Sequence, residues 1–271
     1  MDIKRPTITV FGSCRVHTPC SLLQKRGLLQ MKQNNIFGYI HYTKELIQQC
    51  ELISGAKQAP NRLRPYLNIP YYWQSPKNKN IEIFHSDFKE TDIFIVEISS
   101  IRKIIFKAFY LQINRTRELL NINETVEKNW WEPLVRHGKN HINEYVFDKA
   151  TPLQAEIVQN LKAQDMTFGQ ILEDLKKIKH FLGKPVVFVS HFNTNYEGVP
   201  IPQRQLIVDA MQNIAREEGC RFFDPTQYVL SAGLPEAIQD LGHYRPEFEQ
   251  TIAQLLHGYI EAILPPAISF G

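Results

Sequence analysis

The sequence predicts an α/β fold, a three-layer α/β/α sandwich with a mostly parallel sheet, and three observations support this. Short β-rich runs alternate with amphipathic helical stretches along the 271 residues. The runs at 92–98 and 185–190 are almost continuously apolar, as expected for strands covered on both faces. Polar residues able to carry chemistry follow the strands, at the edge where parallel sheets bind ligands.

The individual elements follow from local patterns. Strands are expected at 7–11, 36–41, 92–98, 185–190 and 220–223, where β-branched and aromatic residues gather. Helices are expected at about 16–29, 167–182, 204–218 and 246–263, where apolar residues recur on one face. Thr167 is expected to cap the second helix with Gln170 in the capping-box position, and Gly183 is expected to end it.

Two segments interrupt the alternation within what is expected to be a single domain spanning 1–271. Residues at about 55–80, rich in Pro, Asn and Tyr, are expected to form a loop or cap. Residues at about 102–165 are expected to form a helical insertion over the edge or the active face of the sheet. The aromatic groups Tyr71-Tyr72-Trp73 and Trp130-Trp131 either stack on a sugar or adenine ring or pack the insertion onto the body.

Composition excludes several functional classes. The net charge of +3 comes without a basic run, so a nucleic-acid partner is not expected. No apolar run approaches the ~20 residues of a membrane span, and the first residues lack a signal-peptide pattern. The four cysteines match neither a disulfide framework nor a zinc pattern, which indicates a reducing cytoplasm. The oligomeric state is left open.

Cys14 is the first candidate for chemistry. It lies in the turn Gly12-Ser13-Cys14, between the first strand and the first helix. Free N–H groups and the helix dipole at such a position favour the thiolate and can stabilise an oxyanion. The alternative is a small buried residue that packs under the start of the helix.

Asp240 and His243 form the second candidate group. They lie three residues apart in the segment 234–244, which is expected to be a loop because Gly242 and Arg245-Pro246 prevent a helix there. The imidazole is expected to act as the base for Cys14, and the carboxylate is expected to orient it. The alternative is an ordinary N-cap region of the last helix.

The order of these motifs resembles the SGNH (GDSL-type) hydrolase superfamily, with Cys14 in place of the nucleophilic serine. The form is similar to the GSCFA-like branch and to related bacterial polysaccharide-biosynthesis proteins. The resemblance implies a flavodoxin-like sheet, and an oxyanion hole that includes the N–H of Gly38. The family's third-block Asn is missing from Glu97-Ile98-Ser99-Ser100, so Ser99, Ser100 or Asn193 is expected to replace it.

The remaining site predictions concern substrate binding. His191 and Asn193 follow a strand and are expected to face the cleft, where His191 is also an alternative base. Arg15 and Arg102 are expected to hold a phosphate or a carboxylate. The resemblance implies an esterase or acyltransferase that acts on a carbohydrate or small molecule and needs no metal or other cofactor. An acetyl-CoA-dependent O-acyltransferase and an inactive ligand-binding protein are the alternatives.

Overall fold

The computed structural model describes residues 5–32, 39–69, 88–138 and 150–263. Its centre is a five-stranded sheet in the order β2-β1-β3-β7-β8, in which each neighbouring pair is parallel. These strands are β1 (Thr7–Phe11), β2 (Gln30–Met31), β3 (Ile93–Ile98), β7 (Val186–Ser190) and β8 (Arg221–Phe223). Numbered along the sheet strands alone, the order is 2-1-3-4-5, the flavodoxin-like order that binds ligands where it reverses, between β1 and β3. The predicted α/β fold is confirmed.

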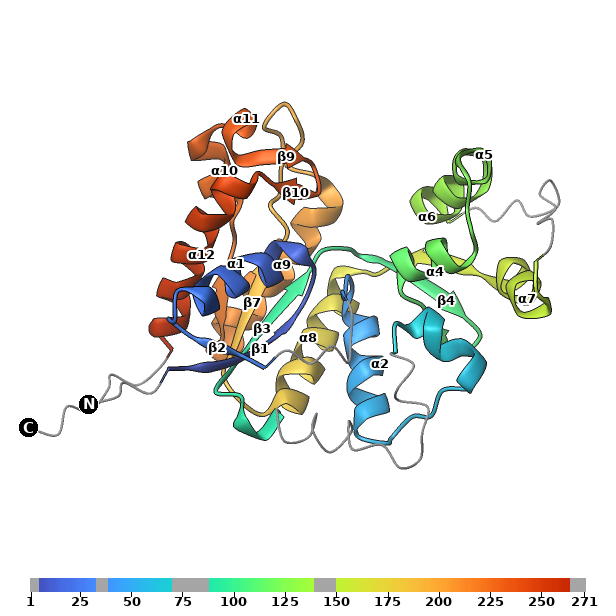
Figure 1. Ribbon diagram of the computed structural model, residues 1–271, viewed down its shortest axis with the longest axis horizontal. Coiled ribbons are helices and arrows are strands. Elements are labelled where there is room, and N and C mark those ends of the chain that lie inside the picture. Colours follow the sequence, from blue (N-terminus) through green and yellow to red (C-terminus); the bar gives the residue numbers. More distant parts are fainter. Residues whose placement is uncertain (1–4, 33–38, 70–87, 139–149, 264–271) are drawn as a thin grey trace, which may run out of the picture.

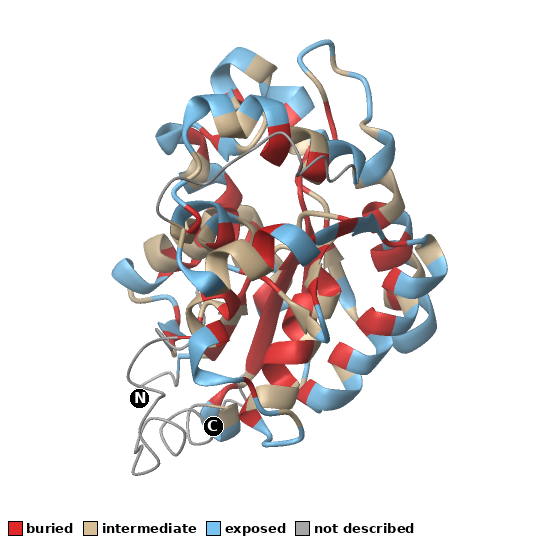
Figure 2. Cartoon of the chain, turned by 90° about the vertical axis from the view of Figure 1, so that its right-hand side faces the viewer, coloured by how far each residue is buried: buried red, intermediate tan, exposed pale blue. Residues whose placement is uncertain are grey.

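Alternate residues of the central strands divide between two hydrophobic clusters. Ile93 and Ile95 of β3 pack with α1 (Cys14–Lys25) and α12 (Pro246–Glu261), on one face of the sheet. Phe94 and Val96 face the opposite cluster, which contains α2 (Thr43–Ile53), α8 (Phe168–Leu182) and α9 (Pro202–Glu218). This period of two, with apolar side chains on both faces, is why β3 is an uninterrupted apolar run. Figure 1 shows the helices around the sheet, and Figure 2 shows the buried residues on its central strands.

Local helix signals predicted the boundaries of α8 correctly. Thr167 accepts a hydrogen bond from the N–H of Gln170, and the Gln170 side chain accepts one from the N–H of Thr167. Gly183 ends the helix with a φ of 61°, a left-handed conformation that glycine adopts without strain. The other long helices, α9 and α12, also lie close to their predicted positions.

The predicted strand at 36–41 is wrong over the residues that the structure describes there. The second strand is β2, and 39–41 is a loop in which the N–H of Ile40 donates to the carbonyl of Gly12, 3.1 Å away. Helix α1 ends at Lys25, earlier than predicted, and Gly27 with a φ of 72° turns the chain back at once. This short connection brings Gln30 beside Thr7 of β1, so the second strand lies earlier in the sequence than the predicted strand at 36–41.

The segment 102–165 contains helices, as predicted, and also a second sheet. Its strands β4 (Arg102–Phe106), β5 (Phe109–Tyr110) and β6 (Lys162–Asp165) pair antiparallel in the order β5-β4-β6. Its helices are α4 (Ile113–Leu119), α5 (Glu124–Val126), α6 (Glu132–His137) and α7 (Pro152–Asn160), with a π-helical turn at Glu127–Trp131. Trp130 and Trp131 are buried, so they pack this segment and present no face to a ligand.

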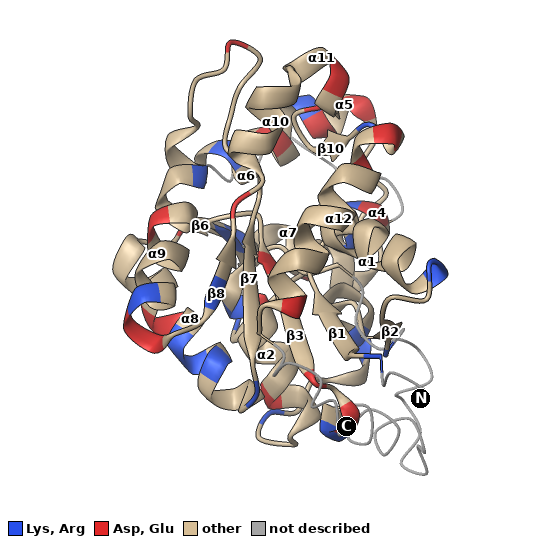
Figure 3. Ribbon diagram, turned by 90° about the vertical axis from the view of Figure 1, so that its left-hand side faces the viewer, with Lys and Arg blue, Asp and Glu red and all other residues tan. Residues whose placement is uncertain are grey.

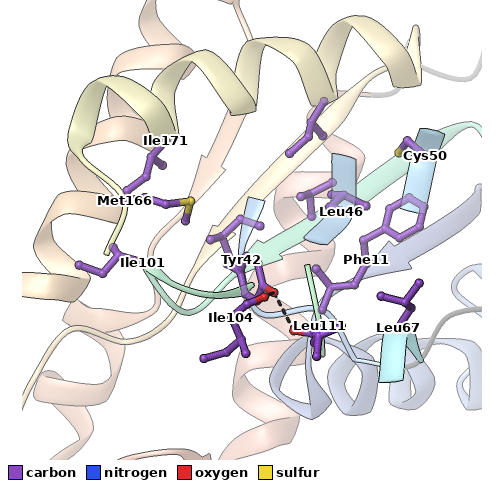
Figure 4. Close-up of a cluster of buried hydrophobic side chains, with 14 of the residues drawn as sticks. Phe11, Tyr42, Leu46, Cys50, Leu67, Ile101, Ile104, Leu111, Met166 and Ile171 are labelled. Carbon is purple, nitrogen blue, oxygen red and sulfur yellow. Dashed lines mark hydrogen bonds between the residues drawn. The ribbon is translucent and has the colours of Figure 1, made fainter. Parts of the chain in front are cut away.

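One hydrophobic cluster joins this second sheet to the main one. Tyr42, at the start of α2, is fully buried and donates its hydroxyl to the carbonyls of Leu111 at 2.7 Å and Ile104 at 3.3 Å (Figure 4). Of the predicted cap at 55–80, the described part includes a 3₁₀ turn at Asn61–Leu67 that packs on the same cluster. Tyr71, Tyr72 and Trp73 lie outside the described residues.

The segment 234–244, predicted to be a loop, is more regular than expected. After α10 (Thr226–Ala232), it forms a short helix α11 (Leu234–Ala237) and an antiparallel pair, β9 (Ile238–Asp240) and β10 (His243–Tyr244). The loop prediction holds for the tip at Leu241 and Gly242 but is wrong for the rest. Pro246 disfavours a helical conformation at the residue before it, and paired extended strands meet this restriction as well as a loop does. Among the described residues, no helix combines the length and hydropathy needed to cross a bilayer.

Candidate active site

Cys14 is the first residue of α1, directly beyond the carboxyl end of β1. Ser13 is the N-cap, and its hydroxyl accepts a hydrogen bond from the N–H of Arg15, 3.3 Å away. A Cβ at Gly12 would lie 2.7 Å from both the Cβ of Glu97 and the Cγ2 of Val16, too close for any side chain. The turn therefore requires glycine at this position because β3 and α1 approach it closely.

The side chain of Glu97, in β3, accepts hydrogen bonds from two residues of this turn. Its Oε2 accepts from the N–H of Ser13 at 2.7 Å and from the Ser13 hydroxyl at 2.6 Å, and its Oε1 accepts from Nε of Arg15 at 2.7 Å. The side chains of Arg15 and Glu97 are 9% and 1% exposed. Burial alone would raise the pKa of Glu97, but the guanidinium and the Ser13 hydrogen bonds hold it below its ordinary value. Figure 3 shows that charged residues lie mainly on the surrounding helices and loops, so a carboxylate inside the sheet is unusual.

Asp240 and His243 are bonded to each other across the β9–β10 pair. Both carboxylate oxygens of Asp240 lie 2.9 Å from Nδ1 of His243, and the N–H of Gly242 donates to Oδ1 at 2.6 Å. Burial opposes the charge on Asp240, but these two donors lower its pKa overall. With Nδ1 held by the carboxylate, Nε2 of His243 is the nitrogen left for proton transfer.

Arg15 joins the turn of Cys14 to the loop of His243. Its Nη1 donates to the carbonyl of Gly242 at 2.7 Å, while its Nε holds Glu97. Cys14 precedes Arg15 and His243 follows Gly242, so this one hydrogen bond joins the immediate sequence neighbours of the two candidate residues. Helix α1 and β10 are in contact, and Figure 1 shows β10 near the start of α1.

A second arginine, which the sequence did not suggest, holds the same loop from the other side. Nη2 of Arg204, in the first turn of α9, donates to the carbonyl of Leu241 at 2.7 Å. Its Nη1 donates to the carbonyl of Phe192 at 2.8 Å, and the guanidinium lies 5.4 Å from the centre of the Phe192 ring. Two neighbouring carbonyls in the Asp240–His243 loop are therefore fixed by two guanidinium groups.

The sequence of this chain matches one protein-family model over almost its whole length. The model described as the TviD N-terminal domain matches residues 6–258. The chain belongs to this family. Among curated proteins it is 26% identical, over 270 residues, to the Vi polysaccharide biosynthesis protein TviD of Salmonella typhi. The match covers 94% of this chain and 31% of that protein, so the chain spans about a third of its relative's length.

Solved structures with a similar course of the chain have low sequence identity. A catalytic mutant of Axe2, an acetylxylan esterase from Geobacillus stearothermophilus, is 11% identical, with 96% of both chains covered and a TM-score of 0.45. A protein from Parabacteroides merdae described as a GDSL-like lipase is 11% identical, with 97% of both chains covered and a TM-score of 0.46. The family match and the curated relative confirm the expected relationship of this chain to bacterial polysaccharide-biosynthesis proteins.

Within this TviD-type domain, the environment of Cys14 differs from the expected one. Burial raises the pKa of the thiol, the charge of Glu97 adds to this, and Arg15 and the backbone N–H groups oppose it only in part. The shift is opposite to the preference for thiolate expected at the helix start, because burial outweighs the neighbouring cation and the backbone N–H groups. Burial raises the pKa of the Tyr39 phenol and the nearby Cys14 adds to this, and the Tyr39 ring centre is 5.7 Å from that of His17.

Of the predicted oxyanion donors, Ser99 lies beside a histidine that the sequence analysis missed. The Ser99 Oγ is 3.2 Å from Nδ1 of His41, and the N–H groups of Ser99 and Ser100 both donate to the carbonyl of His41 at 2.9 Å. The Ser100 hydroxyl instead accepts from the N–H of Arg102 at 2.9 Å and stabilises the turn into β4. Gly38 lies outside the described residues.

The two candidates after β7 are both buried. The Asn193 side chain accepts from the N–H of Ile201 at 2.8 Å and donates to the Gln205 side chain at 2.7 Å, so it fastens a loop. The expectation that it faces the cleft as an oxyanion donor is wrong. His191 is buried with Nδ1 2.9 Å from the carbonyl of Phe192, and burial and Arg15 lower its pKa well below the ordinary value. It is therefore neutral at pH 7.

Both arginines predicted to bind an anion already have partners in the protein. Arg15 is buried between Glu97 and Gly242, as described above. Arg102 pairs with Asp165 through Nε and through Nη2, the latter at 2.7 Å, and Nη2 also reaches the carbonyl of Arg136 at 3.1 Å. That they hold a substrate phosphate or carboxylate stays a prediction, and in this structure nearby acidic residues neutralise both.

A groove of about 610 Å³ borders the β9–β10 pair. Leu230, Leu234 and Ile238 give it an apolar floor. The polar side chains around it are Tyr196, Glu197, Gln239 and Arg245, for which the described part of the chain provides no side-chain hydrogen bond or ion pair. Tyr196 is 65% exposed. Gln239 precedes Asp240 and Arg245 follows His243 by two residues, so the groove is formed partly by the segment that carries the candidate base, but neither Asp240 nor His243 lines it.

No group of three or more His, Cys, Asp or Glu side chains able to hold a metal ion occurs within the described ranges. The four cysteines, which all belong to those ranges, are free thiols. Cys20 and Cys50 are buried, whereas Cys14 and Cys220 are partly accessible. Cys220 is therefore the natural internal comparison for the reactivity of Cys14.

Proposed function

We propose that this domain catalyses acyl-ester chemistry on a carbohydrate, as an esterase or an acyltransferase, with Cys14 as nucleophile, His243 as base and Asp240 as the orienting carboxylate. The observation that carries the proposal is the hydrogen bond from Arg15 to Gly242, which joins the turn of Cys14 to the loop of His243. This hydrogen bond connects two segments whose candidate residues, 14 and 243, are 229 positions apart in the sequence. The 2.9 Å contacts between Asp240 and His243 supply the remaining part of the triad.

The raised pKa of Cys14 determines the form of the mechanism. The resting group is a thiol, so His243 must remove the proton as Sγ attacks the acyl carbon. A C–S bond forms, the carbonyl electron pair moves to oxygen, and the thiol proton passes to His243. Collapse expels the leaving oxygen or sulfur, which takes this proton, and leaves a thioester on Cys14. A sugar hydroxyl or water then takes the acyl group by the reverse sequence.

A carbohydrate substrate is supported by the groove that borders the β9–β10 pair and by the polysaccharide-biosynthesis relative. An exposed tyrosine ring over an apolar floor can pack on a sugar face, and the uncommitted amide, carboxylate and guanidinium can bind hydroxyl groups. We expect Tyr196→Ala to weaken saccharide binding and to leave acylation of Cys14 by a small ester unchanged. A thiol nucleophile must stay reduced, so we also propose a cytoplasmic setting.

The decisive experiment is intact-mass spectrometry after brief exposure to p-nitrophenyl acetate and, separately, to acetyl-CoA. Wild type is expected to gain one acetyl group on Cys14, Cys14→Ala to gain none there, and His243→Ala to react at least about 10²-fold more slowly. The two reagents distinguish an oxygen-ester donor from a CoA-thioester donor.

The matched control is Cys220→Ala, which removes the other partly accessible thiol and is expected to label like wild type. Equal labelling of wild type and Cys14→Ala, or no labelling of wild type by either reagent, would overturn the nucleophile assignment. The ligand-binding alternative would then be tested by adding saccharides and measuring the melting temperature.

A further inference from the structure

Three side chains form a chain of contacts from α4 to the end of β3. Nε2 of His41 lies 3.1 Å from Nδ2 of Asn114, and its Nδ1 lies 3.2 Å from Oγ of Ser99. The backbone of His41 is held as well, because its carbonyl accepts from the N–H groups of Ser99 and Ser100 at 2.9 Å. Its own N–H donates to the buried carboxyl of Glu45 at 3.0 Å. The imidazole is therefore fixed in place with both ring nitrogens in use.

The identities of the neighbouring atoms determine which ring nitrogen carries the proton. Nδ2 of Asn114 is an amide nitrogen and can only donate, so Nε2 of His41 accepts. Burial and the charge of Arg15 lower the pKa of His41 to about 4, so the ring is neutral at pH 7 and has one proton. That proton is on Nδ1 and is donated to Ser99 Oγ. The hydroxyl proton of Ser99 therefore points away from His41 and is free for another acceptor.

Ser99 and Cys14 leave adjacent strands at the place where the strand order reverses. Phe11 of β1 pairs with Val96 of β3, and Cys14 and Ser99 each follow three residues later. The N–H of Ile40, next to His41, donates to the carbonyl of Gly12 in the turn of Cys14. The residues 39–41 thus lie along both strand ends, with Tyr39 toward Cys14 and His41 toward Ser99.

We propose that His41 is a positioning residue, with its tautomer set by Asn114, that directs the Ser99 hydroxyl proton toward the oxyanion formed when Cys14 attacks an acyl group. The inference rests on the proposed function and assigns a replacement for the missing third-block Asn. Ser99 supplies the side-chain donor, and the N–H of Cys14, the first residue of α1, supplies the backbone donor. No proton is transferred in this role, because Ser99 donates a hydrogen bond and keeps its proton.

The substitution Asn114→Asp tests the inference because it reverses the direction of the hydrogen bonds with little change in shape. A carboxylate only accepts, so Nε2 of His41 would carry the proton, Nδ1 would accept, and the Ser99 hydroxyl would turn toward the ring. At pH 8, where the ring remains neutral even beside a new carboxylate, Asn114→Asp is expected to slow acetylation of Cys14 about as much as Ser99→Ala, roughly 10²-fold. Ser99→Asn, which places an amide donor at this position, is expected to acetylate faster than Ser99→Ala and more slowly than wild type.

The control is Arg115→Ala, on the same helix, whose side chain contacts only the exposed Glu118 among the described residues. It is expected to react like wild type. Two-bond ¹H–¹⁵N correlation spectra, assigned with His41→Gln, report the tautomer without any substrate. Wild type is expected to show the proton on Nδ1, and Asn114→Asp is expected to show it on Nε2.

A proton on Nε2 in wild type, or a wild-type rate in a folded Asn114→Asp protein whose tautomer has changed, would overturn the inference. Ser99→Ala serves as the second variant if Asn114→Asp does not fold, and a wild-type rate there would have the same meaning. Loss of the proposed function itself would be recognised separately, because Cys14→Ala would then label like wild type while the tautomer result stood.

Discussion

Two arginines at strand ends show how differently the two sheets of this domain use an ion pair. Arg15, beyond β1 of the parallel sheet, binds Glu97 with side chains 9% and 1% exposed. Arg102, at the start of β4 in the antiparallel sheet, binds Asp165 with side chains 16% and 43% exposed. Arg15 also reaches Gly242, 227 residues away, whereas Arg102 links paired neighbours β4 and β6. The buried pair assembles the candidate active site, and the exposed pair stabilises its own sheet.

The largest expected effect comes from breaking the buried pair. Arg15→Met is expected to lower the free energy of unfolding by about 3–5 kcal/mol, because Glu97 keeps a buried charge without its cationic partner. Urea unfolding at pH 7 measures it, and adding Glu97→Gln is expected to recover part of the loss. Because the folded pKa of Glu97 is lowered, the stabilisation is present above the unfolded pKa and is lost as the pH falls through the folded one. The difference in the free energy of unfolding between wild type and Arg15→Met should therefore decrease in acid. A difference that does not depend on pH would contradict this explanation.

Glu45 sharpens the comparison because it is a buried carboxyl with no cation among the described residues. Burial raises its pKa to about 8, so the folded state keeps a proton that the unfolded state loses near pH 4. Its contribution to stability is full below the unfolded pKa and is lost as the pH rises toward 8.

Glu45→Gln is therefore expected to be more stable than wild type at pH 7 by on the order of 3 kcal/mol, by more than this at pH 9, and equal to it near pH 4. Melting temperatures at pH 4, 7 and 9 test this. A difference that stays constant across the three values would mean that Glu45 is ionised in the folded protein.

Arg204 tests whether the Asp240–His243 loop needs its second arginine. Arg204→Met removes the hydrogen bonds to Leu241 and Phe192 and keeps much of the packing on the Phe192 ring. A loss of about 2 kcal/mol is expected, with faster hydrogen exchange in peptides covering 238–244. Arg216→Met, at the exposed end of the same helix, is the matched control. Unchanged exchange in 238–244 would show that Arg15 alone holds the loop.

The smallest effect is expected for the exposed pair. Arg102→Met should cost less than about 1 kcal/mol, because water already screens the ion pair with Asp165. It should leave acetylation of Cys14 unchanged, as measured by intact mass. A loss comparable to that of Arg15→Met would remove the distinction between the two sheets.

The sequence by itself determined the features that depend on neighbouring residues. The apolar run of β3, the capping box of α8 and the Asp240–His243 spacing are local patterns, and the structure contains all three. The short β2, by contrast, was missed because pairing with β1 makes it a strand, and its own composition does not.

Only the tertiary structure decided the partners of the charged groups. The residues next to Arg15 in the sequence do not indicate whether its side chain faces solvent or Glu97, because Glu97 lies 82 positions further along the chain. Arg204 and His41 were missed for the same reason, since their partners lie 37 and 58 residues away. Local propensities act over a few residues along the chain, whereas the electrostatic environment of a site depends on which distant segments fold against it.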